Sequence, residues 1–482
     1  MPSKLTTYRA KRDPKRTPEP MGSSATRAKR ATKPDAPTFV IQEHHARALH
    51  WDFRLEHDGV LVSWALPKGL PVDPKANHLA VHTEDHPLDY GGFEGEIPKG
   101  EYGGGQVSIW DHGTYDLVKW RDNEVMVDLH GTRAEGRYVL FPTSGKNWMI
   151  HRMDPAPTDF EPMPDHVKPM LASPGELPRS DEGWAYEFKW DGVRATVYID
   201  AGRVRALTRN DKDLVANFPE LRDLGAFLGS RSAILDGEIV ALDDEGRPSF
   251  SKLAHRLHVT AKSAVARLAK ESPVSFLAFD LLYLEGHSTV SLPYDDRRRL
   301  LEALELRGDT FATPPSVPNA KGADMLAVAR ERGLEGVVIK RRDSLYSPGR
   351  RNGNWVKVKN FRTQEVVIGG WTDGREGLAG SLGALLLGIP AENGLAYVGK
   401  VGTGFSDTGR KELLAQLSRL AAEESPFPKR LSAAETRLAH FVRPEVVGEV
   451  QYGEWTPDGH LRHPSWRGLR PDKDASEVVR ES

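Results

Sequence analysis

Short runs in which apolar and polar side chains alternate recur along most of the chain. In an extended strand alternate side chains share a face, so each run turns polar groups to one side and apolar groups to a core. Asp236 and Glu238 share a face in this way, as do Lys357 and Lys359. The pattern predicts strands whose polar faces border a cleft.

Charged helical stretches lie among these strands at 261–270 and 295–306, a mixture typical of an α+β core. After Lys359 the pattern changes to short apolar runs with Gly-rich separators and one charged helical stretch at 406–424. This spacing predicts a small β-barrel. Its predicted strands cover 364–370, 382–389, 395–403 and 446–452.

Proline marks the boundary between the two halves of the chain. Residues 154–165 are too rich in proline for a helix or a central strand, and they predict a semi-rigid linker. A length of 482 residues suggests about three domains of usual size. The predicted divisions are a basic, partly flexible arm (1–33), a first folded domain (34–153), the Pro-rich linker (154–166), an α+β domain (167–362) and a β-barrel domain (363–482).

Composition and charge narrow the class of protein. The chain contains no cysteine, which excludes disulfides, thiol catalysis and cysteine-type zinc fingers and fits a reducing cytoplasm. It shows neither an apolar stretch of membrane-spanning length nor the apolar core of a secretory signal. The net charge is only −2, but residues 1–33 hold ten Lys or Arg against two acidic residues. We expect this arm to bind phosphates in a salt-sensitive way, the alternative being a plain disordered tail.

Lys189, in the sequence EFKWDGVR (187–194), is the first candidate for covalent chemistry. An amine is nucleophilic only when unprotonated, and a free lysine titrates near ~10.4, so burial or nearby cationic charge is needed to expose its lone pair. Taken alone, the motif is more typical of a solvated lysine near a turn.

Further motifs follow Lys189 in order, each a charged point within an apolar run. They are TRN (208–210), LDGEIV (235–240), AFDLLY (278–283), EGVVIK (335–340) and WVKVK (355–359). The ordered set resembles the motifs of ATP-dependent DNA ligases and related covalent nucleotidyltransferases.

The resemblance implies a three-step reaction. Lys189 takes AMP from ATP, AMP passes to a DNA 5′-phosphate, and a 3′-hydroxyl then displaces AMP and seals the strand. By matching position, the nucleotide pocket would be formed by Glu187, Arg194, Arg209, Glu238, Phe279, Lys357 and Lys359. Arg351 is a further candidate for a phosphate contact.

The residue types in this pocket suit a nucleotide. Lys357 and Lys359 repel each other unless an anion such as a triphosphate lies between them. Glu238 and Glu335 could hold a hard divalent ion, Mg²⁺ or Mn²⁺, which prefers oxygen ligands. Phe279 could stack on a purine, the alternative being ordinary core packing.

In ligases of this family the β-barrel after Lys359 is an OB-fold whose final motif closes on the nucleotide. The sequence RHPSWRGLRPDK (462–473) resembles that motif, which implies that Arg470 and Lys473 orient the leaving pyrophosphate. The alternative is a basic stretch that is solvated or touches DNA phosphates.

The front of the chain carries a second group of ligand-type residues. Strand alternation puts His50, Asp52 and Arg54 on one face. Two imidazoles and a carboxylate suit a transition metal such as manganese or zinc, with His44 entering from an adjoining loop as the third ligand. His45 neighbours His44 and could exchange roles with it.

These residues resemble the phosphoesterase domain of bacterial ligase D over about residues 5–155. Members of that family remove a 3′-terminal ribonucleoside and then the remaining 3′-phosphate. The resemblance implies that the manganese ligands are His44, His50 and Asp52, that Arg54, His86 and Tyr90 act at the scissile phosphate with Lys68 nearby, and that Arg12, Asp13 and Glu19 help to build the site.

Together the resemblances predict a multidomain enzyme with a β-barrel-like phosphoesterase domain, an α+β nucleotidyltransferase domain and a C-terminal OB-fold. It would trim 3′ ends and seal double-strand breaks by non-homologous end joining, with ATP and Mg²⁺ or Mn²⁺ in the ligase and Mn²⁺ in the phosphoesterase. The alternatives are an RNA ligase, a capping-type guanylyltransferase or a non-catalytic nucleic-acid scaffold.

The implied partners are double-stranded DNA with nicks or broken ends and the bacterial Ku protein, and the implied location is the cytoplasm, at the nucleoid. Many ligase D proteins add a primase-like polymerase domain. We expect this chain to lack it, so that a separate polymerase would fill any gaps.

Overall fold

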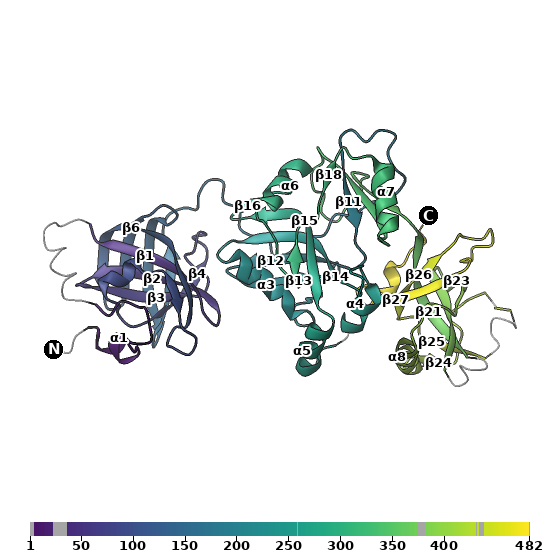
Figure 1. The fold of residues 1–482 in the computed structure, drawn as a ribbon, viewed down its shortest axis with the longest axis horizontal. Coiled ribbons are helices and arrows are strands. Elements are labelled where there is room, and N and C mark those ends of the chain that lie inside the picture. Colours follow the sequence, from purple (N-terminus) through teal and green to yellow (C-terminus); the bar gives the residue numbers. More distant parts are fainter. Residues whose placement is uncertain are drawn as a thin grey trace.

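The computed structural model describes residues 4–22, 36–257, 259–374, 381–429, 431–432 and 438–481. These residues form three folded bodies that follow one another along the longest axis of the molecule (Figure 1). The rest of the predicted arm, residues 1–3 and 23–33, lies outside the described residues. Within the described ranges, every helix is too short or too polar to cross a membrane.

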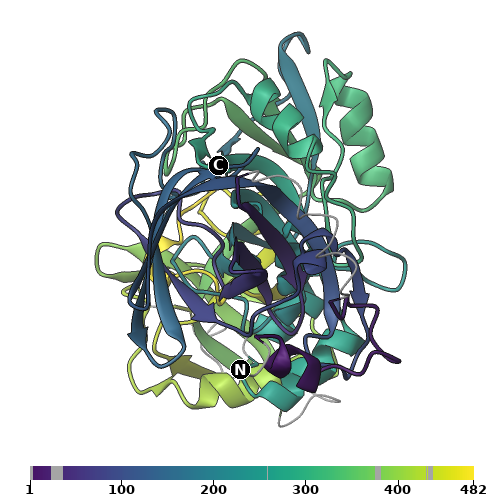
Figure 2. The same ribbon diagram turned by 90° about the vertical axis from the view of Figure 1, so that its left-hand side faces the viewer.

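The first body is a closed antiparallel β-barrel, which Figure 2 shows in front of the other two. The strand order is β1-β2-β3-β4-β9-β8-β7-β6-β5, and pairing of β1 with β6 closes eight of the strands while β5 extends the β6 edge. Buried Ile41, Phe53 and Leu129 contribute to its core. The predicted barrel is confirmed. Its elements are α1 (Thr6–Ala10), β1 (Thr38–His45), β2 (Leu49–His57), β3 (Val60–Leu66), β4 (Asn77–His82), η1 (Leu88–Gly92), β5 (Gly95–Ile97), β6 (Gly105–Arg121), β7 (Glu124–His130), β8 (Glu135–Ser144) and β9 (Asn147–Arg152).

The second body has two β-sheets with helices around them. One sheet runs β10-β20-β19-β11-β18, and the other runs β13-β12-β14-β15-β16 with β17 beside β15. The strands are β10 (Ser173–Pro174), β11 (Trp184–Lys189), β12 (Val193–Asp200), β13 (Arg203–Leu207), β14 (Ala233–Ala241), β15 (Val274–Leu284), β16 (His287–Ser288), β17 (Phe311–Ala312), β18 (Val317–Pro318), β19 (Gly336–Arg341) and β20 (Trp355–Lys359). The helices are η2 (Pro219–Leu221), α3 (Arg222–Leu228), α4 (Phe250–Leu257), α5 (Lys262–Glu271), α6 (Tyr294–Glu302) and α7 (Gly322–Glu331).

Strand β14 shows how alternation builds this second body. Leu235 and Ile239 are fully buried in the main core, whereas Glu238, on the opposite face, borders a cavity. Gly192 lies where the chain passes close to β14, because a Cβ atom there would stand 2.2 Å from the carbonyl oxygen of Ile239. Glycine is therefore required at the turn that follows Lys189.

The third body is an antiparallel sheet with α8 as the one α-helix among its described residues, the architecture expected for an OB-fold. Strand β21 pairs with β22, β25 and β26, and β26 also pairs with β27. Its elements are β21 (Arg362–Asp373), β22 (Leu382–Ala391), β23 (Gly394–Val401), α8 (Asp407–Ser418), β24 (Ala421–Ala422), β25 (Ala439–Val442), β26 (Val447–Tyr452), β27 (Ser465–Leu469) and η4 (Ala475–Glu477).

The helical stretch predicted at 406–424 is shorter in the structure. Ser406 caps the helix by accepting a hydrogen bond from the backbone N–H of Gly409 at 3.1 Å. The helix ends at Ser418, because residues 421–422 pair with β25 instead.

Side-chain contacts and chain connections join the bodies, and between the second and third bodies helix α4 packs against β27. The turn at Ala201 and Gly202, between β12 and β13, packs against Leu49 of the barrel, and Ala201 is buried in the barrel's core. Only Asn360 and Phe361 separate β20 from β21, so the second and third bodies are joined by a two-residue connection.

Candidate active sites

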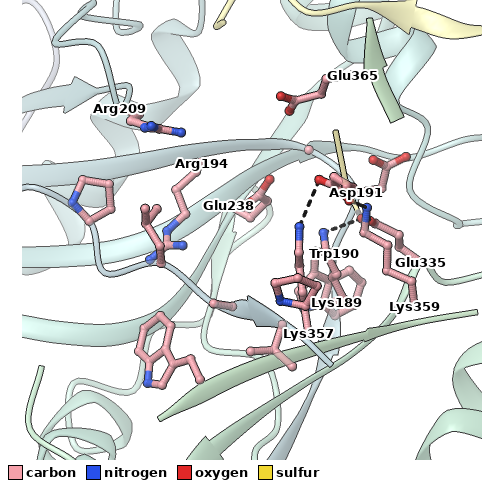
Figure 3. A pocket seen from close by; sticks show the side chains of 18 of the residues that line it. Lys189, Trp190, Asp191, Arg194, Arg209, Glu238, Glu335, Lys357, Lys359 and Glu365 are labelled. Carbon is pink, nitrogen blue, oxygen red and sulfur yellow. Dashed lines mark hydrogen bonds and ion pairs between the residues drawn. The ribbon is translucent and has the colours of Figure 1, made fainter. Parts of the chain in front are cut away.

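Lys189 ends strand β11 and points into a cavity between the second and third bodies (Figure 3). Its Nζ atom donates a hydrogen bond of 2.5 Å to Glu335, which immediately precedes β19. Lys359 on the adjacent strand β20 approaches the other carboxylate oxygen of Glu335 to 3.4 Å. Three strands that pair side by side therefore bring a carboxylate and two ammonium groups together.

Glu335 stays ionised in this arrangement. Burial alone would raise its pKa, but the ammonium groups of Lys189 and Lys359 lower the pKa to about 2. The carboxylate that was predicted to hold a divalent ion therefore holds two cationic side chains. A metal ion would share Glu335 with them or displace one.

The Lys189 cavity has a volume of about 420 Å³, within the usual range for small-molecule sites. Every residue predicted for the nucleotide pocket borders it. These residues are Glu187, Lys189, Arg194, Arg209, Glu238, Phe279, Glu335, Arg351, Lys357, Lys359, Arg470 and Lys473.

Arg194 is fixed by a neighbour that the sequence did not single out. Asp236 on β14 accepts two hydrogen bonds from the Arg194 guanidinium, at 2.7 and 2.6 Å, and one from the Tyr346 hydroxyl at 2.7 Å. The guanidinium lies 4.9 Å from the ring centre of Phe279. Asp236 therefore orients Arg194 against the aromatic wall of the cavity, and the alternation of LDGEIV was the only signal for it.

The carboxylate of Glu187 is held in place by buried side chains. Lys340 lies 3.0 Å from its carboxylate, and the Tyr294 hydroxyl donates a hydrogen bond of 2.5 Å to it. The Lys340 Nζ atom also lies 4.7 Å from the ring centre of Phe279, so this ring has cations on its flanks. Phe279 both packs on buried residues and borders the cavity, so core packing and stacking on a base are compatible.

Glu238 differs from Glu335 in charge. Burial raises the pKa of Glu238 to about 7, although Lys189 and Arg194 oppose the shift. Near neutral pH its carboxyl group is therefore close to half protonated. It can donate a hydrogen bond when neutral and bind a cation when ionised.

The third body closes the cavity through ion pairs at the motif predicted for it. Arg467 on β27 pairs with Asp191, two residues after Lys189, and lies 3.4 Å from Glu449. Arg470 hydrogen-bonds Asp472 at 2.7 Å and also lies 3.4 Å from Glu449. Asp191, Arg467 and Glu449 were missed as functional residues, because their significance depends on how two bodies face each other.

An anion was predicted between Lys357 and Lys359, and the structure contains one. The carboxylate of Glu481 lies 3.1 Å from each Nζ atom. The anion in this structure is a side chain of the same chain.

The second candidate site lies where β1 and β2 pair in the barrel. His44, His50 and Asp52 each offer one ligand atom, and these atoms lie within 4.8 Å of one another. Among the described residues, this is the one group of three or more potential ligands gathered so closely. His44 lies on strand β1 directly opposite His50, so the expectation that it enters from a loop is wrong.

The imidazoles of this His–His–Asp cluster are oriented for a metal ion. The Nε2 atom of His44 lies 2.8 Å from the carbonyl oxygen of Gly103, and the Nδ1 atom of His50 lies 3.0 Å from that of Ala48. A carbonyl accepts only from N–H, so these contacts assign the proton to the outer nitrogen of each ring. The inner nitrogens, which face Asp52, are left as lone-pair donors.

His45 is excluded from the cluster by its own partner. Its Nε2 atom lies 2.7 Å from Glu43, on the other side of β1. The strand thus resolves the ambiguity between neighbouring histidines in favour of His44.

Arg54, His86 and Tyr90 gather beside the cluster, and all three are buried. Arg54 lies 3.0 Å from Asp52, and its guanidinium stands 4.7 Å from the ring centre of Tyr90. Burial lowers the pKa of His86, and the Arg54 charge lowers it further. Lys68 lies in the exposed turn after β3.

The arm contributes residues to this second site. Arg12 pairs with Glu19 at 2.8 Å and with Glu84 at 3.0 Å, and its Nη2 atom lies 3.5 Å from His86. The Tyr90 hydroxyl donates a hydrogen bond of 3.0 Å to Glu19. Residues 4–22 therefore place Arg12 and Glu19 beside His86 and Tyr90, whereas the Asp13 carboxylate accepts a hydrogen bond from the backbone N–H of Lys15.

Three family models match the chain in succession. The model of the DNA ligase D 3′-phosphoesterase domain matches residues 42–142, that of the ATP dependent DNA ligase domain matches 169–359, and that of the ATP dependent DNA ligase C terminal region matches 378–473. The first match contains the His–His–Asp cluster, and the second contains Lys189.

Individual relatives agree with these matches. The multifunctional non-homologous end joining DNA repair protein LigD of Mycobacterium tuberculosis is 49% identical over 487 residues, which cover 99% of this chain and 61% of that protein. DNA ligase C1 of Mycolicibacterium smegmatis is 33% identical to this chain. The match covers 66% of this chain and 94% of that protein. A solved structure of mycobacterial DNA ligase D complexed with ATP and MES is 44% identical, with a TM-score of 0.51, over 65% of this chain and 98% of that chain.

Proposed function

The chain belongs to the ligase D family of ATP-dependent DNA ligases, and from this membership we propose that it cleans the 3′ ends of broken DNA and then seals them with ATP. The process would be the repair of double-strand breaks by non-homologous end joining, which the relatives' names describe. The observation that carries the proposal is the presence, in one chain, of a lysine at the end of β11 facing a nucleotide-sized cavity and a separate His–His–Asp cluster.

Sealing begins with Lys189. Its amine attacks the α-phosphorus of ATP, a nitrogen–phosphorus bond forms, the bond to the bridging oxygen breaks, and pyrophosphate leaves. The amine must first give up the proton that it shares with Glu335. AMP then passes to a DNA 5′-phosphate, and attack by the 3′-hydroxyl releases it.

The other cavity residues have separate roles in this proposal. Phe279 stacks on the adenine, with Arg194 and Lys340 on its flanks. Lys357 and Lys359 neutralise phosphates. Further contacts to the nucleotide come from Glu187, Arg209, Glu238, Arg351, Arg470 and Lys473, all of which border the cavity.

Glu238 and Glu335 are the carboxylates available to a divalent ion in the ligase half, Mg²⁺ or Mn²⁺. When bound, such an ion neutralises charge on the phosphates. Because the pKa of Glu238 is about 7, binding of the divalent ion by its carboxylate depends on pH.

In the barrel, His44, His50 and Asp52 would hold Mn²⁺, whose preference for imidazole and carboxylate ligands this donor set fits. A bound ion there would polarise the phosphoester. Arg54 is placed to bind the 3′-phosphate. His86 and Tyr90 are placed to hold a proton of that phosphate or to transfer one to or from it.

Nicked or broken double-stranded DNA is the proposed substrate, and the nucleoid in the cytoplasm is the proposed location. Ku and a separate primase-like polymerase are proposed partners, on the strength of family membership alone.

The test uses a nicked duplex with a 3′-phosphate, radiolabelled ATP and Mn²⁺. We expect labelled protein on a denaturing gel, loss of the 3′-phosphate and then a sealed strand. Labelled protein without 3′-phosphate removal would reject the barrel's role, and label from GTP but not ATP would favour a capping-type enzyme.

A further inference from the structure

The segment 478–481 follows η4 and enters the mouth of the Lys189 cavity. Val478 is buried in the core of the third body, so the segment is anchored where it begins. Val479 and Glu481 border the cavity itself. The segment therefore passes from the barrel core to the site where the nucleotide is expected.

The backbone of this segment is held in place by two side chains. Gln364 donates a hydrogen bond of 2.9 Å to the carbonyl oxygen of Val479 and accepts one of 2.8 Å from the N–H of Glu481. The indole N–H of Trp455 donates to the carbonyl oxygen of Glu481 at 3.2 Å. These contacts define the direction in which the Glu481 side chain leaves the backbone.

That direction leads to the two lysines of β20. The two carboxylate oxygens of Glu481 divide between them, one at 3.1 Å from Lys357 and the other at 3.1 Å from Lys359. The lysines alternate with Val358, so both project from the same face of the strand. One carboxylate thus bridges a pair of like charges that would otherwise repel.

We propose that Glu481 is an internal ligand of the phosphate subsite, which ATP must displace in order to bind. The inference rests on the proposed function, because it assumes that Lys357 and Lys359 bind the nucleotide's phosphates. The two states exclude each other, since both would use the same ammonium groups.

Displacement requires little movement. The Glu481 side chain is 26% exposed, so it can rotate into solvent while Val478 and the Gln364 contacts keep the segment in place. A triphosphate carries several negative charges, whereas Glu481 carries one, and the triphosphate also reaches further groups in the cavity. ATP therefore displaces Glu481 when ATP is abundant.

The competition lowers the apparent affinity for ATP by the fraction of molecules in which the subsite is free. Two partly exposed ion pairs hold the carboxylate, which corresponds to an effect of about five- to tenfold. Glu481 thus sets the ATP concentration at which the enzyme becomes loaded.

The experiment titrates the full chain with inorganic tripolyphosphate and with ATP, without divalent metal, in a calorimeter. Glu481→Gln keeps the shape of the side chain and removes its charge, and we expect it to bind both probes about five- to tenfold more tightly than the natural protein. Glu445→Gln makes the same change at an exposed site that pairs with Arg443, and it should leave both affinities unchanged.

Equal or weaker binding by a Glu481→Gln protein with an unchanged melting temperature overturns the proposal. A gain in affinity shared equally by Glu445→Gln also overturns it, because the effect would then be one of net charge. Tighter binding of tripolyphosphate to Glu481→Gln supports it even if no variant forms a covalent adenylate, an outcome that would reject the proposed ligase chemistry separately.

Discussion

The ammonium group of Lys189 donates a 2.5 Å hydrogen bond to the carboxylate of Glu335, which lies 146 residues further along the chain. A protonated amine has no lone pair to offer, so an amine that attacks ATP, the role proposed for Lys189, would have to leave this contact first. Because Lys359 approaches the same carboxylate, Glu335 can release one lysine while it remains paired with the other. In the proposed reaction, binding of the nucleotide would have to redistribute these partners before the nitrogen attacks.

Lys189→Ala should abolish covalent adenylate, a loss of about 10³-fold or more, because no other group can replace the attacking nitrogen. Removal of a 3′-phosphate should continue, since the His–His–Asp cluster lies in a different body. Labelled ATP and a denaturing gel measure the covalent adenylate, and a 3′-phosphate release assay measures removal of the 3′-phosphate. Lys270→Ala, at an exposed position on α5, is the control. Persistence of the label would refute the assignment of the nucleophile.

His50→Ala should weaken Mn²⁺ binding and 3′-end trimming by about 100-fold or more and spare the sealing of a clean nick, because it removes one ligand from the cluster. His45→Ala is a matched control, since His45 pairs with Glu43 instead. Calorimetry with Mn²⁺ reads the binding directly. Equal losses in the two variants would contradict the assignment of His50.

Arg467→Ala should slow adenylate formation from ATP by about 10- to 100-fold, because it leaves Asp191 without its partner from the third body and removes one of the two arginines beside Glu449. Sealing of a nick that already carries AMP should be affected less, since the ATP step is bypassed. Arg443→Ala, an exposed arginine of the same body, provides the comparison. Equal slowing of both reactions would argue against a role in the ATP step.

Asp191→Asn should raise stability at alkaline pH. Burial raises the pKa of Asp191 from 3.8 to about 6, although Arg467 opposes the shift. A carboxyl whose pKa is higher in the folded state contributes stability that is full below about pH 4 and lost as the pH rises through about 6. The difference of about 2 pH units corresponds to about 3 kcal/mol, so the variant should match the natural protein near pH 4 and exceed it by up to that amount at pH 8.

Urea denaturation at the two pH values measures this difference. Asp343→Asn, at an exposed position, should show no such pH dependence. A variant less stable than the natural protein at pH 8 would mean that the ion pair with Arg467 outweighs the burial cost.

Arg297→Ala should lower the free energy of unfolding by about 3–5 kcal/mol, because it leaves the fully buried Asp280 charge unpaired. The pair is bidentate, at 2.7 and 2.9 Å. Arg299→Ala, two residues away on the exposed side of α6, should change it by less than about 1 kcal/mol. Denaturant melts of both variants make the comparison, and similar losses would show that α6, rather than the pair, is responsible.

Alternation and local motifs were enough to place the residues that act within one strand. Lys189 at a strand end, Glu238 facing away from Leu235, and Lys357 beside Lys359 all follow from period-two geometry, which depends only on neighbours in the chain. The α+β character of the second body was also predictable from strand and helix patterns, whereas the barrel of the first body followed from the family resemblance.

Partners that meet across bodies were not predictable in the same way. Arg467 with Asp191, and Glu481 with the β20 lysines, are separated by more than a hundred residues, and nothing in their local sequence shows which surfaces face each other. His44 was expected on a loop, and pairing with β2 and β6 made it part of β1.

The two-residue connection at Asn360 and Phe361 has a consequence for the order of events. The third body covers the cavity with Arg470 and pairs with Asp191 through Arg467, so in the proposed ligase reaction a duplex would reach Lys189 only once this cover had moved away. On this proposal a nucleotide fits the cavity as it stands, whereas a duplex requires the third body to turn about Asn360 and Phe361. Because these two residues are the whole length of chain between β20 and β21, the rate of that turning would set an upper limit on the rate of sealing.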